Sequence, residues 1–237
     1  MWYALQGDWP ARYASNVREP YEPPFNAAVR PLLRPGLTVL DVGSGWRPAI
    51  PASARPAGCT YVGLDISAGE LERAGDVYDE SIVADITRFD TRHEARFDLV
   101  VSRFLLEHVA PIDAALESMR LALKPGGHLV SLVPGRFAPF AVANQILPAA
   151  VTRRLLKRTA YRDPTLLFPA VYDRCWHSAL VELLAGWSAA HVEPLYTSAY
   201  YLRFSKLLQS MYLGVEEMLI RLGRRNLASH YVLTATR

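Results

Sequence analysis

The chain has 237 residues, of which 51% are hydrophobic and 21% are charged, and its formal net charge at pH 7 is +3. This composition excludes an intrinsically disordered chain, which would carry fewer apolar residues and a larger net charge. The small net charge also lacks the strong basic bias of a dedicated nucleic-acid-binding protein. We therefore expect a folded protein, and we do not expect nucleic acid to be its partner.

The cysteines and the apolar segments indicate the compartment. Only two cysteines occur, Cys59 and Cys175, without the paired spacing of a zinc site or the density of a disulfide scaffold. The first residues lack the basic start and apolar run of a signal peptide. The segment from Phe137 to Val151 is too short to span a bilayer and is interrupted by Pro139 and Pro148. The sequence predicts a cytoplasmic protein without a metal site, which contacts membranes at most at their surface.

The predicted elements begin with a proline-rich and aromatic lead-in over residues 1–36, which we expect to be a partly helical cover. From Leu37 onward, short β-rich runs alternate with helix-like stretches, the pattern of a doubly wound α/β sheet. We expect a seven-stranded, mostly parallel sheet. In chain order the runs are Thr38 to Val42, Thr60 to Leu64, Ser81 to Val83, Phe97 to Val101, His128 to Val133, Ala190 to Tyr196 and His230 to Thr236.

Helical stretches surround these runs. Apolar residues between Pro111 and Leu123 recur at helical spacing, and Lys124-Pro125-Gly126-Gly127 then ends the predicted helix. Residues 134–174 contain helical stretches broken by proline, and Ser205 to Leu222 is typical of a helix inserted before the last strand. We expect cover insertions at about 134–174 and 198–226.

Glycines and acids follow the first three runs. The first run ends in Gly43-Ser44-Gly45, where the absence of a Cβ lets a ligand lie against the main chain. Asp65 follows Gly43 by 22 residues and ends the second run, where an acid can accept hydrogen bonds from a ribose. Asp85 ends the third run. Because ligands of open α/β sheets bind at the carboxyl ends of strands, these residues predict a ligand site at one edge.

Four ordered blocks of the sequence resemble class I S-adenosylmethionine-dependent methyltransferases, most closely the small-molecule, methyltransferase type 11-like branch. The resemblance is close over about residues 37–135 and general in the later strands. It implies a Rossmann-like methyltransferase fold with residues 37–237 as the methyltransferase domain, and S-adenosylmethionine as the cofactor. The blocks are Asp41-Val42-Gly43-Ser44-Gly45, Asp65, Asp85, and Phe97-Asp98-Leu99-Val100-Val101 with the following Leu106-Glu107-His108-Val109 and Leu123-Lys124-Pro125-Gly126-Gly127.

The same resemblance implies the cofactor-binding residues. The glycine loop would pass the methionine part, Asp65 would hold the ribose hydroxyls, and Asp85 with Ile86 would frame the adenine. Arg47 stands where many relatives carry a third glycine, and it either pairs with the cofactor carboxylate or faces solvent. The full set is Asp41, Gly43, Ser44, Gly45, Arg47, Asp65, Ile66, Asp85, Ile86, Arg103 and Phe104.

The segment after the glycine loop departs from the family pattern. Besides Arg47, it contains Pro48, Pro51 and Pro56, and proline disrupts helix interiors. We therefore expect no long first helix, and little help from a helix dipole at the cofactor.

The acceptor side is less well defined by the sequence. Methyl transfer from a sulfonium requires alignment and exclusion of water, and only some acceptors require a base. The candidate catalytic residues are His108, His177 and Tyr172; His108 also fits a structural helix residue, and the other two fit a core cluster with a helix cap. Aromatic residues are expected to wall the acceptor pocket, namely Tyr172, Trp176, Tyr196, Tyr200 and Tyr201.

The identity of the acceptor stays open. The fourth run ends in Val101-Ser102-Arg103-Phe104 and not in Asn or Asp followed by two prolines and an aromatic, the family pattern for methylating base nitrogens or glutamine amides. This favours a small metabolite or a saccharide or lipid precursor. Two alternatives are a non-catalytic cofactor-binding module and a methyltransferase acting on RNA or at a membrane surface. The latter idea rests on two basic runs, Arg153, Arg154, Lys157 and Arg158, and Arg221, Arg224 and Arg225.

Overall fold

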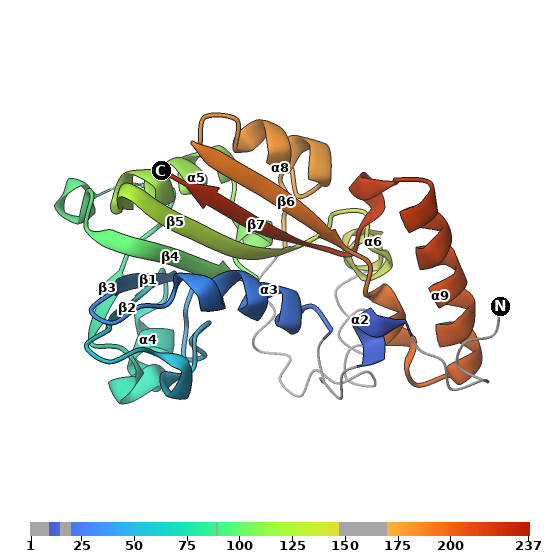
Figure 1. Cartoon of the computed structure of the whole chain (residues 1–237), viewed down its shortest axis with the longest axis horizontal. Coiled ribbons are helices and arrows are strands. Elements are labelled where there is room, and N and C mark those ends of the chain that lie inside the picture. The colour runs from blue at the N-terminus through green and yellow to red at the C-terminus, as the bar shows by residue number, and fades with distance from the viewer. Residues whose placement is uncertain (1–9, 15–19, 89, 147–169) are drawn as a thin grey trace.

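The computed structural model describes residues 10–14, 20–88, 90–146 and 170–237. It contains a seven-stranded sheet in the order β3-β2-β1-β4-β5-β7-β6, which confirms the predicted fold class (Figure 1). All seven predicted runs are strands. Their bounds are β1 Thr38–Val42, β2 Thr60–Asp65, β3 Glu80–Val83, β4 Phe97–Arg103, β5 Leu123–Pro134, β6 Ala189–Leu195 and β7 His230–Thr236.

Strand direction sets where the functional edge lies. The neighbouring pairs from β3 through β5 are parallel, whereas β7 runs antiparallel to both β5 and β6. Consequently six strands end at the same edge, and β7 begins there, with His230 opposite Pro134 of β5 and Leu195 of β6. This carboxyl edge is where open α/β sheets bind ligands.

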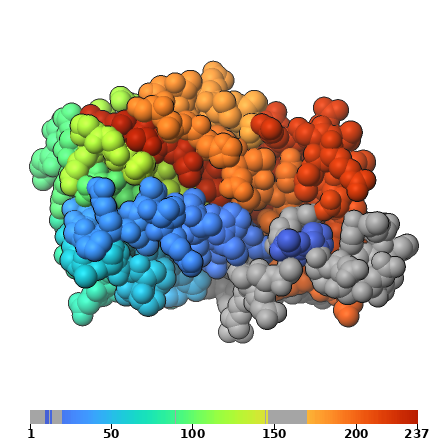
Figure 2. Space-filling view, viewed as in Figure 1, coloured from blue at the N-terminus to red at the C-terminus, as the bar shows by residue number. Residues whose placement is uncertain are grey.

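Side chains alternate between the two faces of the sheet, and each face carries its own apolar core. Leu40 and Val100 belong to the core that includes α5 (Ile112–Ala122) and α8 (His177–Leu183). Val39 and Leu99 belong to the opposite core, with α3 (Glu22–Val29) and α4 (Ala68–Ala74). Figure 2 shows α3 as a blue band across the visible face, so this helix is part of the folded body.

Cover elements gather at the carboxyl edge (Figure 1). They are α2 (Ala11–Ala14), α6 (Pro139–Ile146), the 3₁₀ segment η7 (Ser198–Leu202) and α9 (Lys206–Arg221). The Tyr13 hydroxyl of α2 donates to the buried Glu216 carboxylate of α9 at 2.9 Å, and the Ala199 amide of η7 donates to the same carboxylate at 2.9 Å. These hydrogen bonds tie the first and last cover elements together.

Local sequence signals account for several boundaries. Helix α9 matches the predicted Ser205 to Leu222 helix, because the Ser205 side chain accepts from the Leu208 amide as an N-cap. Helix α5 ends at Ala122 as expected, but β5 already begins at Leu123 and takes in the Pro125-Gly126-Gly127 turn, with a register irregularity opposite Phe97. Short 3₁₀ segments complete the structure: Arg30–Leu32, Ala52–Ala54, Gly75–Val77, Thr91–His93, Leu106–His108 and Arg225–Leu227.

Within the described ranges, no helix is both long and apolar enough to cross a membrane. The first of the two basic runs, residues 153–158, lies outside the described residues. Arg221 ends α9, and Arg224 and Arg225 follow it.

Candidate active site

The glycine loop after β1 has the backbone conformation that its sequence predicts. Gly43 and Gly45 have φ values of +67° and +46°, a region that side chains other than glycine rarely adopt. A Cβ on Gly43 would lie 2.6 Å from Leu105 Cδ1, so the loop after β4 packs directly against it. A Cβ on Gly45 would meet no atom closer than 3.6 Å, which leaves room for a ligand against this part of the main chain.

The glycine loop is held by hydrogen bonds to β2 and to a side chain, and no α-helix follows it before β2. The described residues between β1 and β2 contain only the 3₁₀ turn Ala52–Ala54, which confirms the expectation of no long first helix. The amides of Gly43 and Ser44 both donate to the Leu64 carbonyl, at 2.8 and 3.3 Å. The Tyr78 hydroxyl donates to the Ser44 carbonyl at 3.2 Å. Two backbone hydrogen bonds to β2 and one from the Tyr78 side chain therefore position the loop.

Asp41 is buried beneath the glycine loop, and its predicted role in cofactor binding stays a prediction. Its side chain is 1% exposed, and Oδ2 accepts from the Tyr61 hydroxyl at 2.6 Å and the Ala49 amide at 2.7 Å. Burial raises the pKa of Asp41 to about 6, although these two hydrogen bonds act to lower it. The carboxyl group thus fixes the segment after the glycine loop from inside the protein.

Asp65 joins the glycine loop to the start of α4. Its Oδ2 accepts from the Gly45 amide and its Oδ1 from the Ser67 amide, each at 2.9 Å. A carboxylate offers about four acceptor sites, so these two bonds leave capacity for two ligand hydroxyls. Ile66 follows with 67% of its surface exposed and forms an uncovered apolar wall at the same strand end.

Asp85 forms a compact turn at the end of β3. Its Oδ1 accepts from both the amide and the hydroxyl of Thr87, at 2.9 and 2.8 Å. Both hydrogen bonds hold the pKa of Asp85 below its usual range, and the one from the Thr87 amide has the larger effect. The carboxylate is therefore ionised and oriented beside Ile86, and Oδ2 lies 3.9 Å from the exposed Arg88 guanidinium.

Arg47 is exposed and lies over the Trp46 ring, with its guanidinium carbon 4.2 Å from the ring centroid. Arg73 of α4 lies at the same distance from that ring. The structure thus places two cations beside the end of the glycine loop, and the contact between Arg47 and the cofactor carboxylate stays a prediction.

Arg103 and Phe104, at the end of β4, contact the N-terminal cover. Arg103 donates to the Glu22 carboxylate at 3.0 Å, and the edge of the Phe104 ring packs against Tyr21 with 5.2 Å between centroids. Phe104 has a φ of +58°, and its amide donates to the Leu132 carbonyl at 3.0 Å. Because Leu105 packs under Gly43, this strand end connects the glycine loop to the cover elements.

Glu107, which precedes the candidate His108 and was expected with it near the acceptor, is a buried acid. Only 4% of the Glu107 surface is exposed, and within the described part of the chain the Oε2 atom of Glu107 has no hydrogen-bond partner. Burial raises the pKa of Glu107 to about 8. The Glu107 carbonyl accepts from the amides of Val171 and Tyr172, and His108 Nε2 lies 3.7 Å from Glu107 Oε1. Two of the predicted catalytic residues, His108 and Tyr172, thus lie beside one buried acid.

His177 occupies a different part of the sheet. It begins α8, and its ring lies 6.3 Å from that of Tyr231 in β7. Burial, followed by the nearby Arg225, lowers its pKa. In the sheet, β4 and β5 stand between β7 and β1, and the catalytic role of His177 stays a prediction.

The expected aromatic wall is only partly assembled at the carboxyl edge. Tyr201 lies against Phe140 of α6 with 4.7 Å between ring centroids, and Tyr200 packs edge-on against Tyr201. Trp176 instead pairs with Phe137, and Tyr172 and Tyr196 are buried in the core beneath. The fully buried His230, at the start of β7, lies among the rings of this edge, and we did not single it out from the sequence. Its only sequence signal is its position as the first residue of the last strand.

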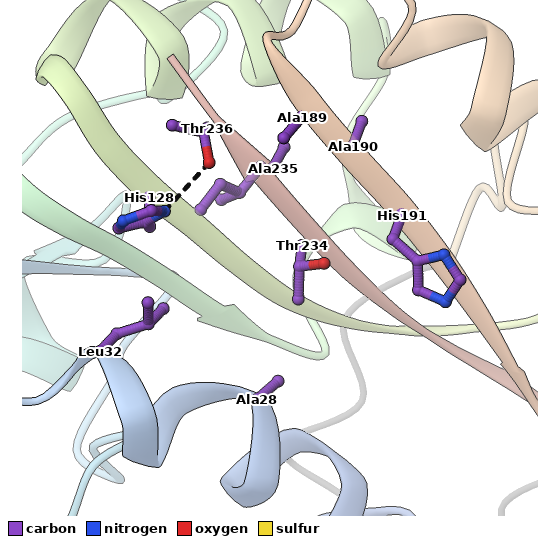
Figure 3. A pocket seen from close by; sticks show the side chains of 10 residues that line it. Ala28, Leu32, His128, Ala189, Ala190, His191, Thr234, Ala235 and Thr236 are labelled. Carbon is purple, nitrogen blue, oxygen red and sulfur yellow. Dashed lines mark hydrogen bonds between the residues drawn. The ribbon is translucent and has the colours of Figure 1, made fainter.

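One pocket lies away from this edge. It opens between the α3 segment and the strands β5, β7 and β6 and is lined by Ala28, Leu32, His128, Leu129, Ala189, Ala190, His191, Thr234, Ala235 and Thr236 (Figure 3). His128 Nδ1 lies 3.1 Å from the Thr236 hydroxyl across its floor. None of the predicted site residues lines it.

Comparisons with known proteins agree with this geometry. A family model described as a methyltransferase domain matches residues 13–178. A ubiquinone biosynthesis O-methyltransferase of Chelativorans sp. is 32% identical over 149 residues, 61% of this chain and 58% of that protein. A ubiquinone/menaquinone biosynthesis C-methyltransferase of Cupriavidus pinatubonensis is 36% identical over 107 residues, 42% of this chain and 44% of that protein. The chain spans about half the length of these curated relatives.

Among solved structures, a Haemonchus contortus phosphoethanolamine N-methyltransferase in complex with phosphomonomethylethanolamine and S-adenosylhomocysteine is similar with a TM-score of 0.53. The two chains are 16% identical, and the alignment covers 91% of this chain and 52% of the Haemonchus chain. At this identity the likeness shows the fold alone. Since the family model covers more than half of the sequence and the sheet has the expected seven, mostly parallel strands, the chain belongs to the methyltransferase domain family and has the fold of class I S-adenosylmethionine-dependent methyltransferases.

Proposed function

We propose that the chain binds S-adenosylmethionine at the carboxyl edge of its sheet and transfers the methyl group to a small-molecule acceptor. The observation that carries this proposal is the position of the Asp65 carboxylate, which accepts from the Gly45 amide and keeps two acceptor sites for ribose hydroxyls. Gly45 beside it provides a main-chain surface with no side chain in the way. Both features fit an adenosyl ligand.

The proposed cofactor contacts follow the order of the strands. Gly43, Ser44 and Gly45 pass the methionine part, Asp65 holds the ribose, and Ile66, Asp85 and Ile86 frame the adenine. Asp41 supports the cofactor site indirectly. Its carboxyl group accepts hydrogen bonds from Tyr61 and Ala49 and thereby fixes the segment that follows the glycine loop. Arg103 and Phe104 form the boundary between the cofactor and the cover elements.

The chemistry that the bound cofactor supplies is a methyl group already activated on sulfonium sulfur. The protein then has to align the acceptor atom in line with that carbon and exclude water. The cover elements α2, α6, η7 and α9 stand over the edge where this alignment occurs. They belong to the less regular parts of the sequence, and we infer that they select the acceptor.

A small molecule is favoured as the acceptor over RNA. The curated relatives are named for ubiquinone or menaquinone biosynthesis, so their names describe small acceptors. The sequence after β4, Ser102-Arg103-Phe104, also lacks the pattern used for methylating base nitrogens. The proposed acceptor class is a small metabolite or a saccharide or lipid precursor.

Cofactor binding can be measured without knowing the acceptor. Isothermal titration of the full chain with S-adenosylhomocysteine and S-adenosylmethionine should give saturable one-site binding, with a dissociation constant in the micromolar range, a binding free energy of about −8 kcal/mol. Absence of heat and of thermal stabilisation by either ligand at millimolar concentration would show that the proposal is wrong.

Replacing Asp65 tests the residue that carries the proposal. Asp65→Ala should weaken S-adenosylhomocysteine binding by about 1–3 kcal/mol, because ribose hydroxyls and the Gly45 amide lose their charged acceptor. Asp76→Ala is the matched control, since Asp76 is an exposed acid in the turn after α4 and should leave the affinity unchanged. Equal affinities for the two folded variants would remove Asp65 from the site.

A further inference from the structure

His230 is a fully enclosed titratable side chain at the carboxyl edge. It is 0% exposed, and its ring lies 4.5 Å from Tyr21 and 5.4 Å from Phe140, measured between centroids. Phe104 and Tyr201 lie at 6.1 and 6.4 Å. We call these four side chains the aromatic box. They come from the start of α3, the end of β4, α6 and η7, so four elements distant in the sequence converge on one imidazole.

The two nitrogens of His230 have different surroundings. Nδ1 lies 3.1 Å from the Thr197 hydroxyl and 3.2 Å from the Ser229 hydroxyl. Nε2 is buried and, within the described part of the chain, has no hydrogen-bond partner. Buried polar atoms without partners are rare in folded proteins, so this nitrogen requires an explanation.

The hydroxyl network determines which nitrogen carries the hydrogen. The Ser229 hydroxyl donates to the Leu195 carbonyl at 2.8 Å and accepts from the Thr197 amide at 2.8 Å. With its one hydrogen committed, Ser229 can only accept, and the Thr197 hydroxyl, 3.0 Å away, can donate to it. Thr197 Oγ1 is then free to accept from Nδ1–H of His230. Every donor of the network is satisfied in this arrangement.

The opposite tautomer would leave a buried Nε2–H without an acceptor among the described residues, which is unfavourable. The Nδ1–H tautomer leaves only a lone pair on Nε2, and unpaired acceptors are tolerated better than unpaired donors. Burial alone lowers the pKa of His230 to about 3, and no charged group contributes to that shift. The ring is therefore neutral, with a basic nitrogen fixed by two hydroxyl groups.

The box lies next to the predicted methyl-transfer position. Leu105 packs under Gly43 of the cofactor loop, and the residue before it, Phe104, forms one side of the box. His230 pairs in the sheet with the last residues of β5 and β6. Phe140 and Tyr201 belong to the cover elements α6 and η7, and Tyr21 immediately precedes α3, so entry of an acceptor requires these rings to move away from the strand end.

We propose that His230 Nε2 is the general base that takes the proton from a hydroxyl group of the acceptor during methyl transfer, and that Thr197 and Ser229 are its positioning residues. This proposal rests on the proposed function and assigns the acceptor as a hydroxyl compound with an apolar or aromatic body. The aromatic box would enclose that body. Among the described residues, none forms a hydrogen bond with Nε2.

The proposed step balances in atoms and charge. A lone pair of the acceptor oxygen forms the new oxygen–methyl bond as the carbon–sulfur bond breaks and leaves its electron pair on sulfur. The hydroxyl proton passes to the Nε2 lone pair, so the positive charge moves from sulfur to imidazolium. A protonated ether is a strong acid, so even a weak base is sufficient. Aromatic faces stabilise the imidazolium by cation–π interaction until it releases its proton to water.

The tautomer can be tested without turnover. In a ¹⁵N spectrum of the full chain with labelled histidine, one of the six histidines should show protonated Nδ1 and unprotonated Nε2 at every pH between about 6 and about 9. His230→Asn assigns this signal by its loss. A protonated Nε2 on His230, or titration of its ring near the ordinary pKa, would overturn the proposal even if the variant itself failed to fold.

Methyl transfer to two probe acceptors separates a base from a structural residue. In His230→Asn, whose amide can still bond Thr197, kcat for catechol should fall by about 100-fold or more at neutral pH. The loss should be much smaller for 4-nitrocatechol, whose hydroxyl is already ionised, and it should shrink for catechol as the pH rises. The affinity for S-adenosylhomocysteine should not change, which keeps this test distinct from that of the proposed function.

His128→Asn is the matched control, because His128 also bonds a strand threonine, Thr236, but at the opposite end of the β5–β7 pair (Figure 3). It should keep full activity on both probes. An equal loss for both catechols at every pH in His230→Asn would indicate a structural role and overturn the proposal. If the wild type binds S-adenosylhomocysteine but methylates neither catechol nor any hydroxyl compound of a boiled cell extract, the hydroxyl assignment is wrong.

Discussion

Replacing Glu107 by glutamine should remove a large pH dependence from the stability of the protein. Burial raises the pKa of Glu107 from 4.5 to about 8, so the folded state binds this proton more tightly than the unfolded state. The stabilisation is therefore complete below about pH 4.5 and is lost as the pH rises through about 8. Since one pKa unit corresponds to about 1.4 kcal/mol, the loss is on the order of 4–5 kcal/mol.

Urea unfolding at several pH values measures this effect. Between about pH 4.5 and about pH 9, the free energy of unfolding of Glu107→Gln relative to the wild type should rise by several kcal/mol. Glu117→Gln is the control, because Glu117 is half exposed in α5 and paired with Arg120, which holds its pKa below the usual range. If the free energy of unfolding changes with pH in the same way for the wild type and Glu107→Gln, Glu107 is not a buried, neutral acid.

Alanine at Gly43 should abolish cofactor binding and destabilise the fold. The φ of +67° costs a residue with a Cβ about 1–2 kcal/mol. In addition, the new Cβ would lie 2.6 Å from Leu105 Cδ1 and 3.0 Å from its Cβ and Cγ, so rotation of the leucine tip alone does not relieve the clash. The loop after β4 has to shift, and with it the boundary of the methyl-transfer position. We expect the affinity for S-adenosylhomocysteine to fall at least about 100-fold, or about 3 kcal/mol.

Two further variants separate the causes. Gly43→Ala/Leu105→Ala should recover the part of the steric loss that Leu105 Cγ and Cδ1 cause, but neither the contact with the remaining Cβ at position 105 nor the backbone part. Gly69→Ala is the matched control, because a Cβ there meets nothing within 4 Å, and a helical glycine replaced by alanine gains about 0.5–1 kcal/mol. If calorimetry finds normal affinity in Gly43→Ala, the loop does not approach the cofactor closely.

The sheet could be predicted from the sequence because each strand is a short apolar run between turn residues. The Thr38–Val42 and His230–Thr236 strands match the predicted bounds fully. Strand β5 begins five residues early, because Leu123 pairs with Phe97 ahead of the glycine turn. Such pairing across an irregular register depends on tertiary contacts and has no local pattern.

The meeting of Gly43, Gly45 and Asp65 at the carboxyl edge was also predictable, since these residues stand at fixed places relative to their strands. The role of Asp41 was not, because the contact of its carboxyl with Tyr61 joins two strands across 20 residues. His230 was missed for a similar reason. Its partners Tyr21, Phe104, Phe140 and Tyr201 span most of the chain, and no local spacing connects them.

Label transfer from S-adenosylmethionine tests the central claim most directly. The full chain is incubated with methyl-labelled cofactor and a boiled small-molecule extract of cells, and products are separated by mass, with Asp65→Ala as the binding-deficient control. The account predicts label in at least one small molecule, an equal amount of S-adenosylhomocysteine, and strongly reduced labelling by the variant. Binding of S-adenosylhomocysteine without label in any small molecule, or label confined to RNA or protein, would contradict it.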